Sequence, residues 1–311
     1  MLKLLLDPRA EGAFFADTVA VALAEVGAVF PAAEPRVDAR ASVTFLDVSL
    51  PEDAAPALLR LAAVQAVFAP EGGGLRLVDA EPGFALPAEL VWGAKYRGKT
   101  HELATQLALN VALAHCRAEG PPKLLDPMAG RGSTLLWAAR YGLEARGIEH
   151  DPRALPDFQR HVKGQCTLQR LKHQERQGSV HAKRKDGVGR FLEYRFGERA
   201  LKLITGDARD APALLGGERV HLIVADLPYG VQHVGPTGTR DPLPVLRECA
   251  PGWAELLKPG GAMVLIYNRF LPKREALVEA FEAAGLAAQP FEAPHRMSAS
   301  ILRDLAVFTR P

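Results

Sequence analysis

Apolar and polar positions follow different patterns in the two parts of the chain, and the first part predicts a small α+β domain. The expected strands are residues 2–6, 28–30, 42–48 and 66–79, the last broken by Glu-Gly-Gly-Gly. A helix rich in Ala and Val is expected over residues 12–26, and a second helix begins at Pro51, followed by two acids that suit the positive end of its dipole. The order β-α-β-β-α-β predicts a ferredoxin-like domain over residues 1–92.

From about residue 93 the pattern changes to strands that alternate with helices. Expected strands lie at residues 123–126, 145–149, 201–205, 220–225, 262–267 and 305–309. Expected helices lie at residues 101–116, 133–141, 243–257 and 273–284. Such alternation predicts an α/β domain over residues 93–311, with a mostly parallel, Rossmann-like doubly wound sheet. Ligands of these sheets bind beyond the carboxyl ends of the strands. The proline-rich residues 81–89 are the expected linker.

Composition narrows the class of protein. A chain of 311 residues with 48% hydrophobic and 24% charged residues has material for a sizeable core. Cys116, Cys166 and Cys249 lie far apart and form no C-x-x-C pair, which favours a reducing cytoplasm over a disulfide framework. No run approaches eighteen uninterrupted apolar residues, so we expect no membrane span. The nine histidines form no metal motif, so no metal is expected, and no obligatory protein partner is evident.

A glycine-rich turn follows the first parallel strand: residues 126–134 are Asp-Pro-Met-Ala-Gly-Arg-Gly-Ser-Thr. Gly130 and Gly132 allow close backbone approach to a ligand, and the next helix presents free N–H groups to an anionic group such as a carboxylate. Glu149 ends the second strand, where an acid can bind ribose hydroxyls, and Asp207 ends the third, where one can bind an adenine amino group. Each acid alone could be a helix cap. Acids at three successive strand ends predict a nucleoside-containing cofactor.

The fourth strand runs into Asp226-Leu227-Pro228-Tyr229. An amino group on a nucleic acid base is a poor nucleophile because its lone pair is delocalised into the ring. The Asp226 carboxylate and the Leu227 carbonyl can accept its two hydrogens, turn the lone pair toward an incoming methyl group and stabilise developing positive charge. Pro228 fixes the loop, and Tyr229 offers a stacking face. This segment therefore predicts methyl transfer to an exocyclic amine.

Together these motifs resemble the S-adenosylmethionine-dependent amino-group methyltransferases with a [D/N]-P-P-[Y/F] signature, and most closely the tRNA guanine-N2 methyltransferases, which usually carry a THUMP domain. The resemblance covers roughly residues 95–311, with Leu227 at the first proline position. It implies a methyltransferase-type Rossmann-like sheet and transfer to guanine N2 of tRNA or rRNA. It also implies that Asp126, Ala129, Gly130 and Gly132 hold the methionine part of the cofactor, Glu149 the ribose, Asp207 and Ala208 the adenine, and Asp226, Leu227, Pro228 and Tyr229 the target amine.

A basic insertion occupies about residues 152–200. Within residues 160–190, nine Lys and Arg face two acids, a net charge of +7 in a chain whose total is +2. The segment lacks Phe, Tyr and Trp, so it would bind phosphates and not stack bases. Lys183, Arg184 and Lys185 are the expected substrate contacts, with RNA as the partner; the alternative is a solvated loop. The N-terminal domain is a possible second RNA-binding element.

Residues 93–100, Gly-Ala-Lys-Tyr-Arg-Gly-Lys-Thr, also fit the P-loop pattern of NTPases. That interpretation needs a strand at residues 90–92 and leaves Asp126, Glu149 and Tyr229 without a role. In the methyltransferase interpretation, Lys99 and Thr100 begin a helix beside the cofactor. DNA-adenine and protein-glutamine methyltransferases would share every motif with a different acceptor, and a non-catalytic RNA-binding protein is a further alternative.

Overall fold

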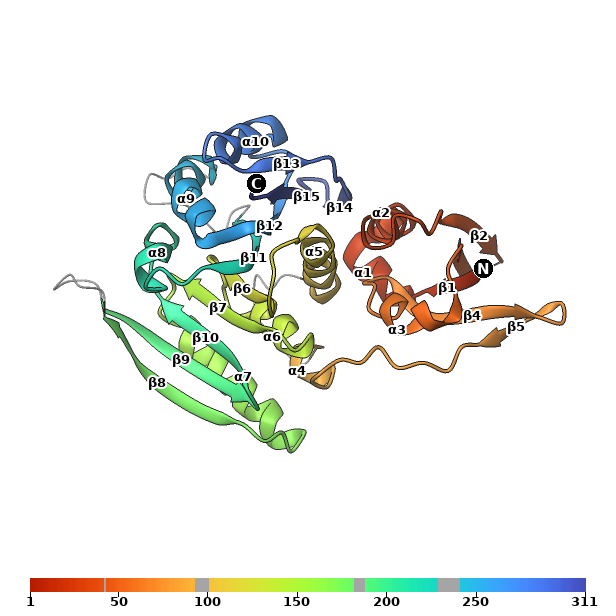
Figure 1. Ribbon diagram of the computed structural model, residues 1–311, viewed down its shortest axis with the longest axis horizontal. Coiled ribbons are helices and arrows are strands. Elements are labelled where there is room, and N and C mark those ends of the chain that lie inside the picture. The colour runs from red at the N-terminus through yellow and green to blue at the C-terminus, as the bar shows by residue number, and fades with distance from the viewer. Residues whose placement is uncertain (42, 93–100, 182–187, 229–240) are drawn as a thin grey trace.

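The computed structural model describes residues 1–41, 43–92, 101–181, 188–228 and 241–311, which form two units (Figure 1). The first unit contains the strands β1 (Leu2–Leu6), β2 (Arg36–Arg40), β3 (Val43–Val48), β4 (Val64–Glu71) and β5 (Gly74–Leu77). Its helical segments are η1 (Pro8–Ala10), α1 (Glu11–Phe14), η2 (Phe15–Asp17), α2 (Thr18–Val29), η3 (Glu52–Ala54) and α3 (Ala55–Leu58). The sheet is antiparallel with the order β2-β3-β1-β4-β5. The order β4-β1-β3-β2 with two helical crossovers is ferredoxin-like, which confirms the predicted fold of this unit.

Two expected elements of this unit were wrong. The helix expected over residues 12–26 is broken, because Phe15 adopts a φ of 51° between α1 and α2. The strand expected at residues 28–30 is absent, since α2 continues to Val29. The missing strand is β2, an edge strand of sequence Arg-Val-Asp-Ala-Arg with little burial, so its residues give no apolar signal.

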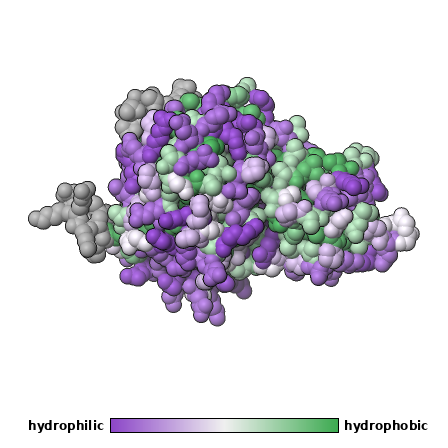
Figure 2. Space-filling view, turned by 45° about the horizontal axis from the view of Figure 1, so that its top comes forward, coloured by the Kyte–Doolittle hydropathy of each residue, from purple (hydrophilic) through white to green (hydrophobic). Residues whose placement is uncertain are grey.

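The helical run Pro8–Val29 is long and apolar enough, by length and composition, to cross a membrane, with a mean hydropathy of 1.6. It is the one such run in the described part of the chain, and core helices of globular proteins pass the same test. The run is divided into four short helical segments. Val21, Ala22 and Val26 of α2 are buried in the core of the first unit, and Figure 2 shows apolar surface over that unit.

The second unit contains a ten-stranded mixed sheet. Its central strands are β6 (Lys123–Asp126), β7 (Glu144–Glu149), β10 (Arg199–Thr205), β11 (Val220–Asp226), β12 (Leu257–Asn268), β13 (Ala287–Gln289), β14 (His295–Ser298) and β15 (Ile301–Thr309). The order is β10-β7-β6-β11-β12-β15-β13, with β10 to β12 parallel and β15 antiparallel to both neighbours. Because the strand order reverses at β6, the sheet is doubly wound. The predicted Rossmann-like methyltransferase sheet is confirmed by this topology.

Helices cover both faces of this sheet. They are α4 (Glu89–Trp92), α5 (Glu102–His115), α6 (Ser133–Arg140), α7 (Ala154–Leu168), η4 (Ala208–Asp210), α8 (Ala211–Leu214), α9 (Leu243–Leu256) and α10 (Arg274–Glu282). One apolar core joins α5, α6 and α7 to one face, and a second core joins α8, α9 and α10 to the other. The expected helices at 101–116, 133–141, 243–257 and 273–284 are confirmed within a few residues.

The basic insertion forms α7 and a β-hairpin, β8 (Gln174–His181) and β9 (Val188–Phe196), which extends the sheet beyond β10 (Figure 1). Leu192 and Tyr194 of β9 are buried, and the Tyr194 ring packs edge-on against Phe158 of α7 at 6.1 Å. The hairpin was not expected from the sequence, since the exposed strand β8 reads Gln-Glu-Arg-Gln-Gly-Ser-Val-His. Polar residues occur on both faces of β8, so no alternation of apolar and polar residues marks it as a strand.

The two units meet along α2 and α5 (Figure 1). Buried polar side chains lie in this contact. Glu25 of α2 accepts hydrogen bonds from the Ala62 N–H at 2.9 Å and from Asn110 Nδ2 of α5 at 2.7 Å. Asn110 Nδ2 and the Tyr141 hydroxyl both donate to the Arg60 carbonyl, at 2.8 and 3.1 Å. Burial raises the pKa of Glu25 to about 7, although its hydrogen bonds oppose the shift. The contact between the units is therefore sensitive to the ionisation of one acid.

Candidate functional site

Four motif-bearing loops leave the same edge of the large sheet. Strands β6 and β11 are parallel neighbours in which Leu124 pairs with Leu222, so Asp126 is level with Val224 and Asp226 ends the neighbouring strand two residues further on. On the other side of β6, Glu149 pairs with Thr205 at the ends of β7 and β10. The Ala129 N–H donates to the Ile148 carbonyl at 2.9 Å, which ties the glycine-rich turn to β7. Topology thus brings together the ends of the four strands that carry the predicted motifs.

The glycine-rich turn adopts a backbone that needs glycine at two positions. Gly130 and Gly132 have φ angles of 53° and 83°, and Gly132 caps α6. A Cβ atom at Gly132 would lie 2.7 Å from the ring of Phe158, so a side chain there would displace α7. Ala129, between Asp126 and these glycines, is almost completely buried. The turn therefore presents bare backbone at the start of α6.

Three carboxylates gather beside this turn. Asp126 is 2% exposed and accepts a hydrogen bond from the Met128 N–H at 3.0 Å. Glu149 accepts from the Gly130 N–H at 2.8 Å and from the Asp151 N–H at 2.7 Å. Burial raises the pKa of Asp126 to about 7; its hydrogen bonds lower it, and the charges of Glu149 and Asp226 raise it further. A cluster of this kind favours a cationic ligand, which would relieve the repulsion.

Asp207 and Ala208 make structural contacts at the end of β10. Asp207 caps η4 by accepting a hydrogen bond from the Arg209 N–H at 2.9 Å, and it forms an ion pair with the Arg209 guanidinium at 2.7 Å. This pairing holds the pKa of Asp207 below its usual range. The Ala208 carbonyl accepts from Trp253 Nε1 at 3.0 Å. Asp207 thus has the helix-capping role that was the alternative for these acids. Binding of adenine by Asp207 stays a prediction.

The segment Asp226-Leu227-Pro228 leaves β11 at the same edge. Oδ2 of Asp226 accepts a hydrogen bond from Arg303 Nη2 of β15 at 3.2 Å. The Leu227 N–H donates to the Ile266 carbonyl at 2.8 Å, which fixes the peptide. Within the described ranges, no group donates a hydrogen bond to the Leu227 carbonyl. Asp226 and the Leu227 carbonyl are therefore held by the sheet, while Tyr229 lies outside the described residues.

Arg303 was missed in the sequence, although a signal was present. Residues 301–309 read Ile-Leu-Arg-Asp-Leu-Ala-Val-Phe-Thr, a strand of apolar residues that contains two adjacent charges. Arg303 and Asp304 are 2% and 0% exposed. Charged residues are almost never fully buried unless they are paired, so two of them in a core strand indicate a site.

The predicted RNA contacts Lys183, Arg184 and Lys185 lie outside the described residues, as do Lys99 and Thr100. Strand β9, which follows the first three along the chain, begins at the carboxyl edge of the sheet, where the Arg190 N–H donates to Thr205 Oγ1 at 2.9 Å. The P-loop interpretation needs a strand at residues 90–92, and this prediction is wrong because Glu89–Trp92 forms the helix α4. The P-loop interpretation therefore loses the strand–loop–helix context on which it depends.

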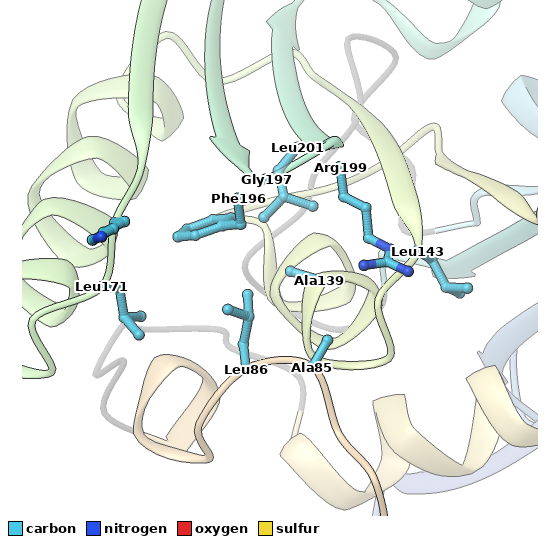
Figure 3. Close-up of a pocket in the computed structure, with 10 residues that line it drawn as sticks. Ala85, Leu86, Ala139, Leu143, Leu171, Phe196, Gly197, Arg199 and Leu201 are labelled. Atoms are coloured by element: carbon cyan, nitrogen blue, oxygen red, sulfur yellow. The ribbon is translucent and has the colours of Figure 1, made fainter.

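A cavity of about 250 Å³ lies at the opposite, amino-terminal edge of the sheet (Figure 3). Leu86 of the linker, Ala139 of α6 and Phe196 of β9 line it, with Lys172 and Arg199 as its cations. None of the predicted site residues contributes to it. Among the described residues, no group of three or more His, Cys, Asp or Glu side chains is placed to hold a metal ion.

No protein-family model matches this chain, and no curated protein matches its sequence. Solved structures with a similar trace include TrmN from Thermus thermophilus, with 14% identity, coverage of 100% of this chain and 99% of the other, and a TM-score of 0.47. Another is the T. thermophilus 16S rRNA N2 G1207 methyltransferase RsmC in complex with AdoMet and guanosine, with 19% identity, coverage of 89% and 58%, and a TM-score of 0.41. The rRNA methyltransferase aviRa from Streptomyces viridochromogenes has 15% identity, coverage of 72% and 90%, and a TM-score of 0.43. Values this low assign no activity to this chain.

Proposed function

We propose that this protein is an S-adenosylmethionine-dependent RNA methyltransferase that modifies an exocyclic amine, with guanine N2 of tRNA or rRNA as the acceptor. One observation carries the proposal: the glycine-rich turn, the Asp126 and Glu149 carboxylates and the Asp226-Leu227-Pro228 segment meet at one edge of a doubly wound sheet. This arrangement supports a cofactor site and an amine-binding loop within reach of each other.

The residues of this edge suit the cofactor. Bound S-adenosylmethionine supplies an electrophilic methyl group on a positively charged sulfur, together with an ammonium and a carboxylate. The backbone of Ala129, Gly130 and Gly132 at the start of α6 would receive the carboxylate, because free N–H groups at a helix start favour anions. Asp126 lies in a cluster of negative charge that favours the cations. Glu149 would hold the ribose, and Asp207 with Ala208 would hold the adenine.

The chain's own residues would prepare the acceptor amine. The Asp226 carboxylate and the Leu227 carbonyl accept its two hydrogens, which turns the nitrogen lone pair toward the methyl group. Pro228 fixes the loop, and Tyr229 stacks on the base. During transfer, positive charge would grow on the nitrogen, and the Asp226 carboxylate would stabilise it. The sulfur would leave as S-adenosylhomocysteine, and the methylated nitrogen would then release one proton to solvent. Positioning of this kind contributes much of the acceleration, and no covalent enzyme intermediate is needed.

The basic insertion supports RNA as the acceptor. The β8–β9 hairpin adds cations beside the end of β10, where Arg190 is exposed and Lys183, Arg184 and Lys185 follow β8 along the chain. Such charges bind a phosphate backbone whatever its sequence, so they would hold the RNA while the site selects the base. The domain at residues 1–92 would add a second contact to the RNA.

The test is transfer of a labelled methyl group from S-adenosylmethionine to separate pools of tRNA, rRNA, DNA and protein, followed by digestion and analysis of the products. We expect N2-methylguanosine in tRNA or rRNA. Label in N6-methyladenine of DNA, or in methylglutamine of protein, would keep the methyl-transfer chemistry and overturn the RNA assignment. RNA binding without label in any pool would overturn the enzyme assignment and favour a non-catalytic RNA-binding protein.

A further inference from the structure

A buried arginine from the last strand of the sheet reaches the proposed catalytic acid. Arg303 lies opposite Asn268 on β12, and Asp226 lies opposite Ile266 on the same strand. The Arg303 side chain therefore crosses over β12 to place Nη2 3.2 Å from Asp226 Oδ2. The two side chains point to the face of the sheet that α5 covers. Arg303 is only 2% exposed, so its guanidinium cannot serve as an RNA phosphate contact.

The charge of Arg303 is not explained by the packing around it. The same face of β15 continues with Leu305 and Val307, which are buried in the apolar core. An aliphatic residue at position 303 would extend this row without the cost of removing a guanidinium from water. The neighbouring Asp304 points to the opposite face and has its own cations, Arg269 at 3.5 Å and Arg274 at 3.7 Å. Among the residues that the structure describes, Arg303 forms an ion pair with Asp226.

The surroundings of Asp226 explain why a cation is useful there. Asp126 and Glu149 place two further carboxylates at this edge, and the charge of Asp226 is felt at Asp126. Carboxylates crowded at one edge repel one another, and this repulsion acts against an Asp226 side chain that has to face the acceptor amine. A guanidinium at Oδ2 offsets this repulsion and fixes the orientation of the carboxylate. His295, which lies opposite Arg303 on β14, is kept neutral because burial lowers its pKa.

We infer that Arg303 is a positioning residue for methyl transfer: its ion pair holds the Asp226 carboxylate in place and aimed at the acceptor amine. Arg303 is buried and would act through Asp226. The inference rests on the proposed function, since it assigns to Asp226 the role given there. It adds a residue from the far end of the chain to a site built otherwise from residues 126–229.

The experiment compares Arg303→Met and Arg303→Lys with the unmodified protein and with Arg269→Met as a matched control. Arg269 is also a cation near β15, but it serves Asp304 on the other face. We measure S-adenosylmethionine affinity, thermal unfolding and the single-turnover rate of methyl transfer to the RNA that the wild type modifies. Arg303→Met should lower the rate by about 100-fold and leave cofactor affinity unchanged. Arg303→Lys, which keeps a charge but not the forked geometry, should recover part of the loss.

A second comparison separates positioning from folding. If Arg303 acts through Asp226, adding Arg303→Met to Asp226→Ala should lower the rate little further, because residues that act as a unit are not additive. A wild-type rate in Arg303→Met, or a full and independent further loss in the double variant, would overturn the inference while the proposed function stands. If Arg303→Met fails to fold, Arg303→Lys takes its place in both comparisons. A wild-type rate for Arg303→Lys, or a full further loss when it is combined with Asp226→Ala, would then overturn the inference. A wild-type protein that transfers no methyl group to any pool overturns both proposals.

Discussion

Replacing Asp126 with Asn should make the ligand-free protein more stable at alkaline pH and at the same time impair cofactor binding. Burial holds Asp126 at a pKa of about 7, against an ordinary value of 3.8. Because the folded state binds this proton more tightly than the unfolded chain does, the stabilisation is complete below pH 4 and is lost as the pH rises toward 7. The shift of about three pKa units corresponds to roughly 4 kcal/mol, of which roughly 3 kcal/mol falls between pH 5 and pH 8.

The assay is denaturant unfolding of the wild type and of Asp126→Asn at pH 5 and pH 8. The wild type should lose stability between these values, and the variant should lose less by roughly 3 kcal/mol, since an amide has no proton to release. Asn keeps an oxygen for the Met128 N–H, so the turn should survive. Asp210→Asn, which removes an exposed carboxylate, is the control and should follow the wild type.

Cofactor binding gives the second half of this prediction. A cationic ligand favours ionised Asp126, so S-adenosylmethionine should bind the wild type with release of a proton near pH 7. Calorimetry in two buffers of different ionisation enthalpy measures that proton. Asp126→Asn should bind more weakly and release fewer protons. The same pH dependence of unfolding and the same proton release in both proteins would refute the reasoning that places Asp126 in a buried cluster of acids.

Two further predictions concern the contact between the units and the hairpin. Burial raises the pKa of Glu25 from 4.5 to about 7, so the wild type should lose stability between pH 5 and pH 8, and Glu25→Gln should lose less by roughly 3 kcal/mol in denaturant unfolding. Glu25→Leu removes the acceptors for Ala62 and Asn110 and should destabilise the protein at every pH. Equal effects of the two changes would contradict this prediction. Reversing Lys183, Arg184 and Lys185 to Glu should weaken RNA binding and make its dependence on salt shallower by about 2 units of log–log slope in a titration of affinity against KCl. Unchanged affinity would mean that these residues are only solvated.

The large sheet was predictable because each of its inner strands is buried on both faces. Runs such as Val-His-Leu-Ile-Val-Ala at 220–225 have few competing interpretations, and the expected bounds of β6 match the structure. The exposed strands were not predictable in the same way. Strands β2 and β8 hold their place through backbone pairing and carry mainly polar residues, so hydrophobic period gives no signal for them.

The candidate site divides along a similar line. Asp126, Gly130, Gly132, Glu149 and Asp226 could be singled out because each follows a strand in the chain, and parallel strands end at one edge. Arg303 could not be linked to Asp226 in this way. Its partner lies 77 residues earlier and two strands away, and only the antiparallel register of β15 on β12 brings them together. Local spacing in the sequence contains no information about that register.

The most direct test of the central claim is the single-turnover rate of methyl transfer by Asp226→Ala and Asp226→Asn with saturating S-adenosylmethionine and the modified RNA. Asp226→Ala removes the side-chain acceptor for the amine and should slow transfer by about 100-fold to 1,000-fold, with cofactor affinity unchanged. Asp226→Asn keeps an oxygen acceptor and should retain more activity. Transfer at the wild-type rate by Asp226→Ala would contradict the account, because the amine would then be held and activated elsewhere.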